Sequence, residues 1–171
     1  TVRYLQPHFN VVLFDEPYAG QSKQYNSNRR PITKEQEASI LLELIERYRA
    51  DHLMSFSWGG ASALLALAQR PARIRKAVIL AFSPLINSAM RDYLERGIDL
   101  LVNCERKALG ELLNSTIGEH LPSLVKRFNF RHIVSLDEHE YHQMAFHVSQ
   151  VLTQDTRCYL RGSADIDTPI L

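Results

Sequence analysis

Residues 55–60 (SFSWGG) have the residue types and the spacing of a nucleophilic serine held in a sharp turn between a strand and a helix. Such a turn needs small residues two positions before and two positions after the nucleophile, because the two backbones nearly touch there. Ser55 and Gly59 meet this need, although glycine is more usual at the first position. We predict that Ser57 is the nucleophile of an acyl transfer, and that the backbone N–H of Trp58 stabilises the oxyanion from the helix start. The alternative is an ordinary turn in which Ser57 caps the helix.

The partners of such a serine are expected outside this chain. A serine hydroxyl needs a general base, and in this type of site the acid and the histidine follow the serine on loops after later strands. The chain begins with Thr1 rather than Met and stops at Leu171, where a strand is starting. We therefore expect an internal fragment that is inactive by itself. The acid and histidine are expected beyond Leu171, and the second oxyanion donor before Thr1.

The elements that must position the serine alternate between strand and helix. Short apolar runs predict strands of a parallel sheet at Asn10–Phe14, His52–Phe56 and Ala77–Phe82. Thr33 and Gln36 form a capping box, and the helix that they open has an apolar stripe made of Ala38, Leu41, Leu42, Ile45 and Tyr48. A second helix follows the serine turn and is stopped by Pro71. This alternation indicates a parallel sheet with helices on its faces.

After Pro84 the pattern changes to apolar residues at helical spacing. We divide the chain into the N-terminal part of a core (1–86), a helical cap insertion (87–157) and a return to the sheet (158–171). The predicted fold class is α/β, a partial α/β-hydrolase fold with flanking helices and a helical cap. We expect the cap to cover Ser57 and to bury an aliphatic chain, since each buried methylene contributes about 0.8 kcal/mol.

Composition excludes several classes of function. The 171 residues have a formal net charge of +1, which gives no support to a nucleic-acid-binding protein. No apolar run is long enough to span a membrane, and no signal peptide opens the chain. Cys104 and Cys158 are far apart in sequence, without the spacing of metal ligands. We therefore predict a cytoplasmic protein with two free thiols and no metal site.

Four segments together resemble one enzyme family: FNVVLFDEPYAGQS, ITKEQEASILLELIERY, MSFSWGGASALLALA and HLPSLVKRFNFRHIVSLDEHEY. The sequence resembles the 3-hydroxyacyl-ACP:CoA transacylases of polyhydroxyalkanoate synthesis, and less closely the acyltransferases that make 3-(3-hydroxyalkanoyloxy)alkanoate for rhamnolipids. The resemblance implies transfer of a 3-hydroxyacyl group from acyl carrier protein (ACP) to coenzyme A through an acyl-Ser57 enzyme. Coenzyme A would be a substrate, and no cofactor is expected.

Other functions stay open. Water in place of coenzyme A gives a 3-hydroxyacyl-ACP thioesterase, and a second hydroxyacyl chain gives the rhamnolipid-type reaction. An alternative of another class is a non-catalytic binding protein of α/β-hydrolase fold. The family also has an H-x4-D motif, matched here by His132 and Asp137. Residues five apart on a helix are turned by about 140°, so we expect these two residues in the cap, with a surface or gating role rather than a catalytic one.

Weaker signals concern charge. The loop between Lys23 and Lys34 has four basic residues and no acid, and we expect Arg29 and Arg30 to help dock the acidic carrier protein. Asp15 and Gly20 are expected to shape the loop after the first strand. The cap histidines, which are His139, His142 and His147, are expected to form a mixed polar face with neighbouring acids rather than a metal site.

Overall fold

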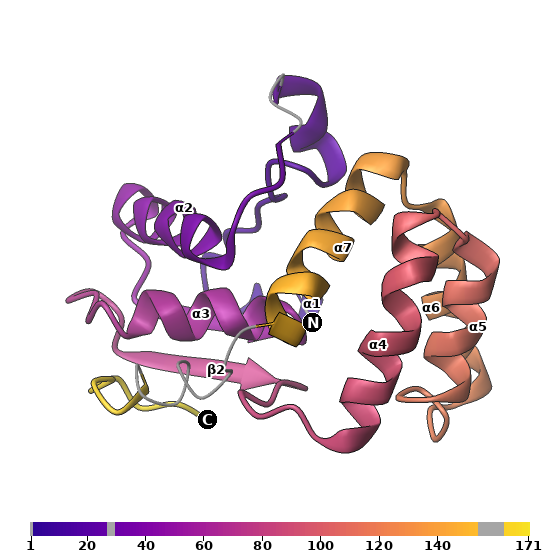
Figure 1. Cartoon of the computed structure of the whole chain (residues 1–171). Coiled ribbons are helices and arrows are strands. Elements are labelled where there is room, and N and C mark those ends of the chain that lie inside the picture. Colours follow the sequence, from indigo (N-terminus) through magenta and orange to yellow (C-terminus); the bar gives the residue numbers. More distant parts are fainter. Residues whose placement is uncertain (1, 27–29, 154–162) are drawn as a thin grey trace.

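Two parallel strands and the helix between them position the serine turn. The computed structural model describes residues 2–26, 30–153 and 163–171 (Figure 1). Strand β1 (His52–Phe56) pairs in parallel with strand β2 (Lys76–Leu80), and Ser55 lies opposite Ile79. Helix α3 (Gly59–Leu67) connects the strands and ends before Pro71. The predicted strand–helix–strand unit around the serine turn is therefore confirmed.

The C-terminal residues extend the sheet at the outer edge of β2. Ile170 forms a parallel bridge with Ala77. The N–H of Ala77 donates to the carbonyl of Pro169 at 2.9 Å, and the N–H of Leu171 donates to the carbonyl of Ala77 at 3.0 Å. The chain thus comes back beside β2 after the helical segment.

Helix α2 (Lys34–Tyr48) packs on α3 and begins with the predicted capping box (Figure 1). The Thr33 hydroxyl accepts from the Gln36 N–H at 3.2 Å, and the Gln36 side chain accepts from the Thr33 N–H at 2.8 Å. The core formed by this helix, α3 and the strands contains Ile45, Leu53, Ala63, Leu67, Ile74 and Ala77. Tyr48, predicted on the buried stripe, is half exposed because it lies in the last turn of the helix.

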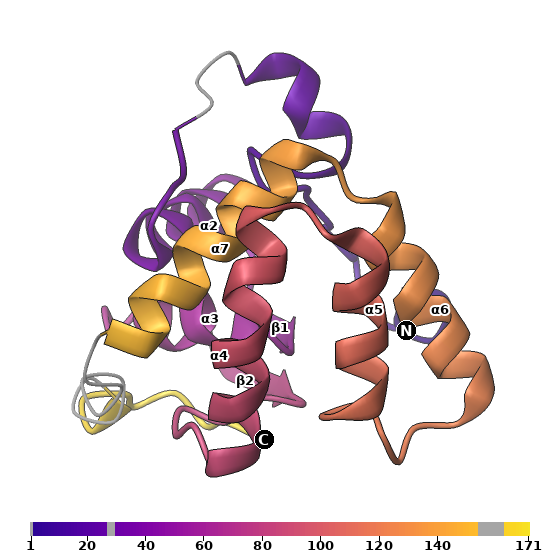
Figure 2. The same cartoon turned by 45° about the vertical axis from the view of Figure 1, so that its right-hand side comes forward.

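Four helices make up the described part of the segment between β2 and the C-terminal residues: α4 (Ser88–Val102), α5 (Arg106–Ser115), α6 (Ser123–Ser135) and α7 (Glu138–Thr153). They enclose a second core made of Leu94, Leu101, Leu109, Ile133, Tyr141, Ala145 and Val148. Helix α7 lies between α2 and α3 on one side and α4 on the other (Figures 1 and 2). We call these four helices the cap helices; the domain boundaries stay a prediction.

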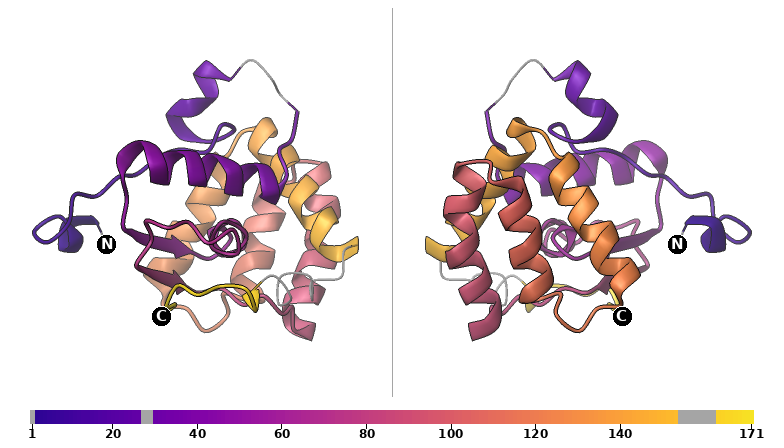
Figure 3. Two further views of the ribbon diagram at one scale, coloured as in Figure 1. Left: turned by 90° about the vertical axis from the view of Figure 1, so that its left-hand side faces the viewer. Right: turned by 90° about the vertical axis from the view of Figure 1, so that its right-hand side faces the viewer.

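The predicted strand at Asn10–Phe14 is wrong. These residues pair with no strand among those described, and Leu13 is 71% exposed. Figure 3 shows the N-terminal segment, with helix α1 (Val2–Leu5), extending away from the rest of the molecule. An apolar run becomes a strand only when a neighbour takes up its backbone hydrogen bonds, and the described residues supply no such neighbour here.

The strand predicted at Ala77–Phe82 is displaced to Lys76–Leu80. Ala81 has φ +53°, which is outside the extended region, so the strand ends before it. A short 3₁₀ helix, η1 (Gly20–Tyr25), lies in the loop before α2. Within the described ranges, no helix has both the length and the apolar character that a membrane span requires.

Candidate active site

Ser57 occupies a strained turn between β1 and α3. Its φ is +51°, in the left-handed region that non-glycine residues rarely adopt. Its N–H donates to the carbonyl of Leu80 at the end of β2 (2.8 Å), and its own carbonyl accepts from the N–H of Gly60 (2.9 Å). These bonds tie the turn to the neighbouring strand and to the helix. Strain of this kind persists only where the surroundings hold it, and it is concentrated at functional sites.

The two glycines that follow the turn differ in the space around them. A Cβ added to Gly60 would lie 2.3 Å from the ring of Phe82, which is far inside van der Waals contact. A Cβ added to Gly59 would meet only the Cβ of Ser55, at 3.9 Å. The buried hydroxyl of Ser55 has no hydrogen-bond partner among the described residues. Gly60 is therefore the glycine that has no room for a side chain, whereas Gly59, predicted to need a small residue, has ordinary space around it.

The N-terminus of α3 faces this turn. Trp58 already has helical backbone angles (φ −57°, ψ −26°) and precedes the first residue of the helix. Its N–H donates to no acceptor within the described ranges. A free amide at a helix N-terminus is suited to bind developing negative charge.

An apolar cavity of about 150 Å³ adjoins the serine, and core and cap residues both line it. Ser57, Trp58 and Ala61 come from the turn and α3, whereas Met90 and Leu94 of α4 and Val151 of α7 come from the cap. The other lining residues are Lys34 and the segment Ala81, Phe82, Ser83, Pro84, Leu85, Ile86 and Asn87. Its mainly apolar lining suits the first carbons of an aliphatic chain that begins at Ser57.

A buried polar cluster lies behind Trp58 and is centred on Glu37 of α2. Its carboxylate accepts hydrogen bonds from the hydroxyl of Tyr18 (2.7 Å), the ammonium of Lys34 (2.6 Å) and the hydroxyl of Ser62 on α3 (2.5 Å). Burial alone would raise the pKa of Glu37, but Lys34 and the hydrogen bond from Ser62 bring it below its ordinary value. Glu37 is therefore a buried carboxylate in its ionised form.

His147 connects this cluster to the cap. The indole N–H of Trp58 donates to its Nδ1 at 3.2 Å, so Nδ1 has no proton and Nε2 donates to the carbonyl of Ile32 at 2.8 Å. Burial, and then the nearby charge of Lys34, lowers the pKa of His147 to about 4, although Glu37, 3.5 Å away, opposes this shift. The ring is therefore neutral at physiological pH.

Gln143 of α7 strengthens the same connection. Its Oε1 accepts from the N–H of Ile32 at 2.9 Å, and its Nε2 donates to the carbonyl of Ile32 at 2.8 Å. Both Gln143 and His147 are almost fully buried. Helix α7 is thus held to the segment before α2 and to the residue that follows Ser57.

The prediction that placed His147 on a mixed polar face is wrong, because its side chain is only 2% exposed. Met144, Val148 and Val151 recur at helical spacing, and His147 falls on the same stripe. That periodicity was the signal for its burial. His142, by contrast, is exposed and lies 3.9 Å from Glu138.

The basic loop also differs from expectation. Lys34 is buried, and Lys23 forms ion pairs with Asp137 (2.7 Å) and Glu140 (3.1 Å) of the cap. Arg30 is exposed, and Arg29 lies outside the described residues. Lys23 and Lys34 are therefore engaged within the protein rather than turned toward a partner.

His132 and Asp137 make no hydrogen bond or ion pair with each other in the described structure. His132 is exposed on α6. Asp137 caps α7, since its Oδ1 accepts from the N–H of Glu140 at 3.0 Å and its own N–H donates to the Glu140 carboxylate at 2.9 Å. The contacts of Asp137 are those of a helix cap at the surface.

Asp15 and Gly20 shape their loop as predicted. The carboxylate of Asp15 accepts from the N–H of Gln21 at 2.9 Å, and its carbonyl accepts from the Ser22 hydroxyl at 2.8 Å. Gly20 has φ +49°, and an added Cβ would lie 2.3 Å from the Asp15 carboxylate. Glycine is needed there both for its backbone angle and for space.

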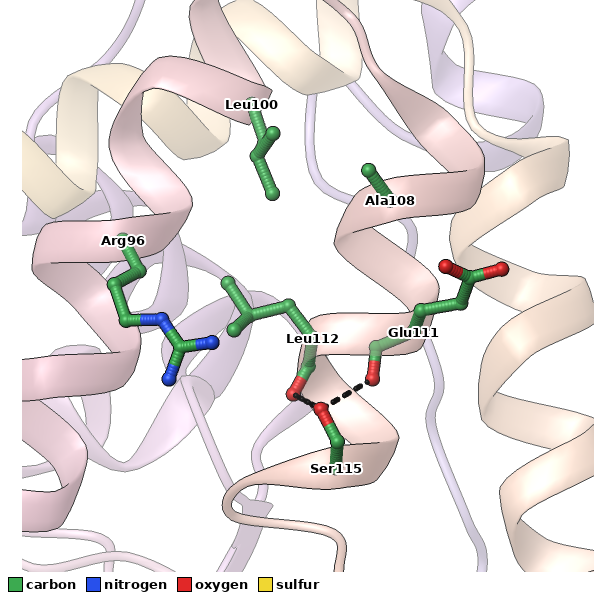
Figure 4. Close-up of a pocket in the computed structure, with 6 residues that line it drawn as sticks. All are labelled: Arg96, Leu100, Ala108, Glu111, Leu112 and Ser115. Atoms are coloured by element: carbon green, nitrogen blue, oxygen red, sulfur yellow. Dashed lines mark hydrogen bonds between the residues drawn. The ribbon is translucent and has the colours of Figure 1, made fainter.

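A second, open groove of about 300 Å³ lies between α4 and α5 and has no residue in common with the cavity at Ser57 (Figure 4). The Ser115 hydroxyl in this groove donates to backbone carbonyls of α5. Cys104 is a free thiol, and Cys158 lies outside the described residues. These features add no reactive group to the site at Ser57.

Comparison with known proteins gives sequence relatives of one kind. No protein-family model matches the chain. Over all 171 residues the chain is 62% identical to an (R)-3-hydroxydecanoyl-ACP:CoA transacylase of Pseudomonas aeruginosa, and it spans 57% of that protein. It is 61% and 60% identical to proteins with the same name from Ectopseudomonas oleovorans and Pseudomonas putida, and spans 58% of each. The resemblance seen in the sequence is therefore confirmed, and the chain is homologous along its whole length to (R)-3-hydroxydecanoyl-ACP:CoA transacylases, of whose length it spans somewhat more than half.

Proposed function

We propose that the full-length protein is an acyltransferase of the α/β-hydrolase fold that moves 3-hydroxyacyl groups from ACP to coenzyme A in the cytoplasm. The product would supply polyhydroxyalkanoate synthesis. The observation that carries the proposal is the strained φ of +51° at Ser57, at a strand-to-helix turn beside an apolar cavity. The names of the relatives support the choice of ACP and coenzyme A as substrates.

In the first half-reaction the Ser57 hydroxyl attacks the thioester carbonyl of the acyl-ACP. A base removes the hydroxyl proton, and the oxyanion accepts a hydrogen bond from the N–H of Trp58. The carbon–sulfur bond breaks, and the carrier thiol leaves with a proton as the acyl-Ser57 ester forms. We assign the base and its acid partner to the region of the full-length protein that corresponds to the part of the relatives not matched by this chain.

In the second half-reaction the thiol of coenzyme A attacks the acyl-Ser57 ester. Collapse of the tetrahedral intermediate returns the proton to Ser57 and releases 3-hydroxyacyl-coenzyme A. Attack by water would give the free acid, and attack by the hydroxyl of a second hydroxyacyl chain would give the rhamnolipid-type product. These reactions share every step before the acceptor arrives, so only product analysis with and without coenzyme A separates them.

The test uses the full-length enzyme with 3-hydroxydecanoyl-ACP and no acceptor. Intact-protein mass spectrometry should detect a 3-hydroxydecanoyl adduct, and peptide mapping should locate it on Ser57. Ser57→Ala should abolish both the adduct and turnover, whereas Ser39→Ala, at an exposed serine of α2, should change neither. An adduct on another residue, or full turnover by Ser57→Ala, would reject the mechanism. A full-length protein whose Ser57 is inert to fluorophosphonate would instead support the binding-protein alternative.

A further inference from the structure

The polar groups of the cavity at Ser57 are few, and most are engaged with the backbone. Besides Ser57, the polar lining residues are Lys34, Ser83 and Asn87. Asn87 accepts from the N–H of Met90 at 2.8 Å and so caps α4. The Ser83 hydroxyl donates to the carbonyl of Leu85 at 2.9 Å and accepts from its N–H at 3.2 Å. The Ser83 hydroxyl and the Asn87 carbonyl oxygen are thus engaged with the backbone, which leaves the neutral amide nitrogen of Asn87 and the ammonium of Lys34 as donors at the cavity.

Lys34 differs from these residues because its ammonium has donors to spare. An ammonium has three N–H donors, and within the described ranges only the carboxylate of Glu37 accepts from it, at 2.6 Å. Lys34 is 4% exposed, so bulk water does not take up the rest. Its Nζ lies 5.4 Å from the centre of the Trp58 ring, which also lines the cavity.

The cluster around Lys34 holds a polar donor in an otherwise apolar space. Glu37 is itself held by hydrogen bonds from Tyr18 and Ser62, so the position of the Lys34 ammonium that it binds is fixed as well. A buried ion pair is seldom retained for stability alone, because desolvation offsets most of the attraction between its charges. The pair lies beside the nucleophile, since Lys34 and Ser57 line the same cavity.

We propose that Lys34 donates a hydrogen bond to the 3-hydroxyl group of the acyl chain bound at Ser57. This inference rests on the proposed function and names the residue that selects its substrate class. The hydroxyl-bearing carbon is two carbons from the carbonyl that Ser57 attacks, so the hydroxyl must lie close to the nucleophile. The remaining alkyl chain continues among Met90, Leu94 and Val151.

The experiment compares kcat/KM for 3-hydroxydecanoyl-ACP and for decanoyl-ACP, which lacks only the hydroxyl. A hydrogen bond to a charged group discriminates by about 10- to 100-fold, so we expect the wild-type enzyme to prefer the hydroxylated substrate by that factor. The double variant Lys34→Met/Glu37→Gln removes the donor without leaving Glu37 as an unpaired charge. It should bring the ratio of the two kcat/KM values close to one, and Lys34→Arg should retain most of the preference.

The matched control is Lys23→Met/Glu140→Gln, which removes another Lys–Glu pair, between η1 and α7. Neither residue lines the cavity at Ser57, so this variant should keep the wild-type ratio. The substrate preference of the wild-type enzyme is measured without any variant. Equal kcat/KM values for the two substrates would therefore overturn the inference even if the double variant does not fold. A preference that survives in a folded double variant overturns it as well. The acyl-Ser57 adduct is measured in the same samples: its absence from the wild type rejects the proposed function, whereas an adduct with unchanged preference rejects only the role of Lys34.

Discussion

The ammonium of Lys34 lies 2.6 Å from the carboxylate of Glu37, and both side chains are almost fully buried, one turn apart on α2. Breaking a buried ion pair by removing one partner leaves an unpaired charge in a poorly solvated place. The structure makes this pair the point where α2, α3 and the loop residue Tyr18 meet. Loss of this ion pair should therefore lower the free energy of unfolding of the protein.

Lys34→Met should reduce the free energy of unfolding by about 3–5 kcal/mol, because Glu37 is left buried without its cation. Adding Glu37→Gln should recover a large part of this loss, since the hydrogen bonds from Tyr18 and Ser62 then meet a neutral amide. Urea unfolding of the full-length protein, followed by circular dichroism, measures both. Equal losses in the single and double variants would show that the ion pair does not govern stability here.

The close approach of Gly60 to Phe82 gives a second prediction. Gly60→Ala places a methyl group 2.3 Å from the ring and should cost about 1–3 kcal/mol by overpacking. Gly59→Ala, one residue earlier, finds ordinary contact at 3.9 Å and should leave the stability nearly unchanged. Thermal unfolding of the two variants side by side gives the comparison. A loss in Gly59→Ala as large as in Gly60→Ala would contradict the packing described.

Substitution by glycine, which relieves the backbone strain at position 57, measures that strain. At φ +51° the left-handed conformation costs a residue with a Cβ about 1 kcal/mol, and glycine avoids that cost. Ser57→Gly should therefore be more stable than Ser57→Ala by about 1 kcal/mol. At Ser39, inside α2, the order should be reversed by a similar amount, about 1 kcal/mol. Chemical denaturation of the four variants tests both signs, and glycine being the less stable at position 57 would show that the turn is relaxed.

Local sequence signals were sufficient for much of the fold. The capping box at Thr33, the strand of residues 52–56 and the turn at Ser57 each depend on neighbours close in sequence, and each is present in the structure. The run at Asn10–Phe14 is different, because an apolar run becomes a strand only through a partner distant in sequence. Composition alone does not say whether that partner is there.

The buried polar cluster could not be predicted for a related reason. Lysine and glutamate usually lie at the surface, and histidine is of intermediate burial, so residue type alone did not predict that Lys34, Glu37 and His147 would be buried. They are buried because α2, the serine turn and α7 come together from distant parts of the chain. The apolar stripe around His147 indicated that this one residue is buried. No local sequence pattern predicted its hydrogen bond with Trp58.

Acidification should weaken the fold through His147. Its pKa is about 4 in the folded protein against 6.5 for an ordinary histidine, so between these values the unfolded chain binds more protons than the folded one. The free energy of unfolding then falls as the pH is lowered from 6.5 to 4, by on the order of 3 kcal/mol from this residue. His147→Asn retains an acceptor for Trp58 but cannot be protonated, so it should lack this part of the pH dependence.

The comparison between wild type and His147→Asn isolates the histidine. Burial raises the pKa of Glu16 to about 7, which has the opposite effect, since its protonation stabilises the folded state as the pH falls. Because both proteins contain Glu16, its contribution cancels in the difference. The stability advantage of the wild type over His147→Asn, measured by urea unfolding at several pH values, should shrink from pH 6.5 to pH 4. A difference that stays constant over this range would mean that burial and the charge of Lys34 do not hold His147 neutral in the folded protein.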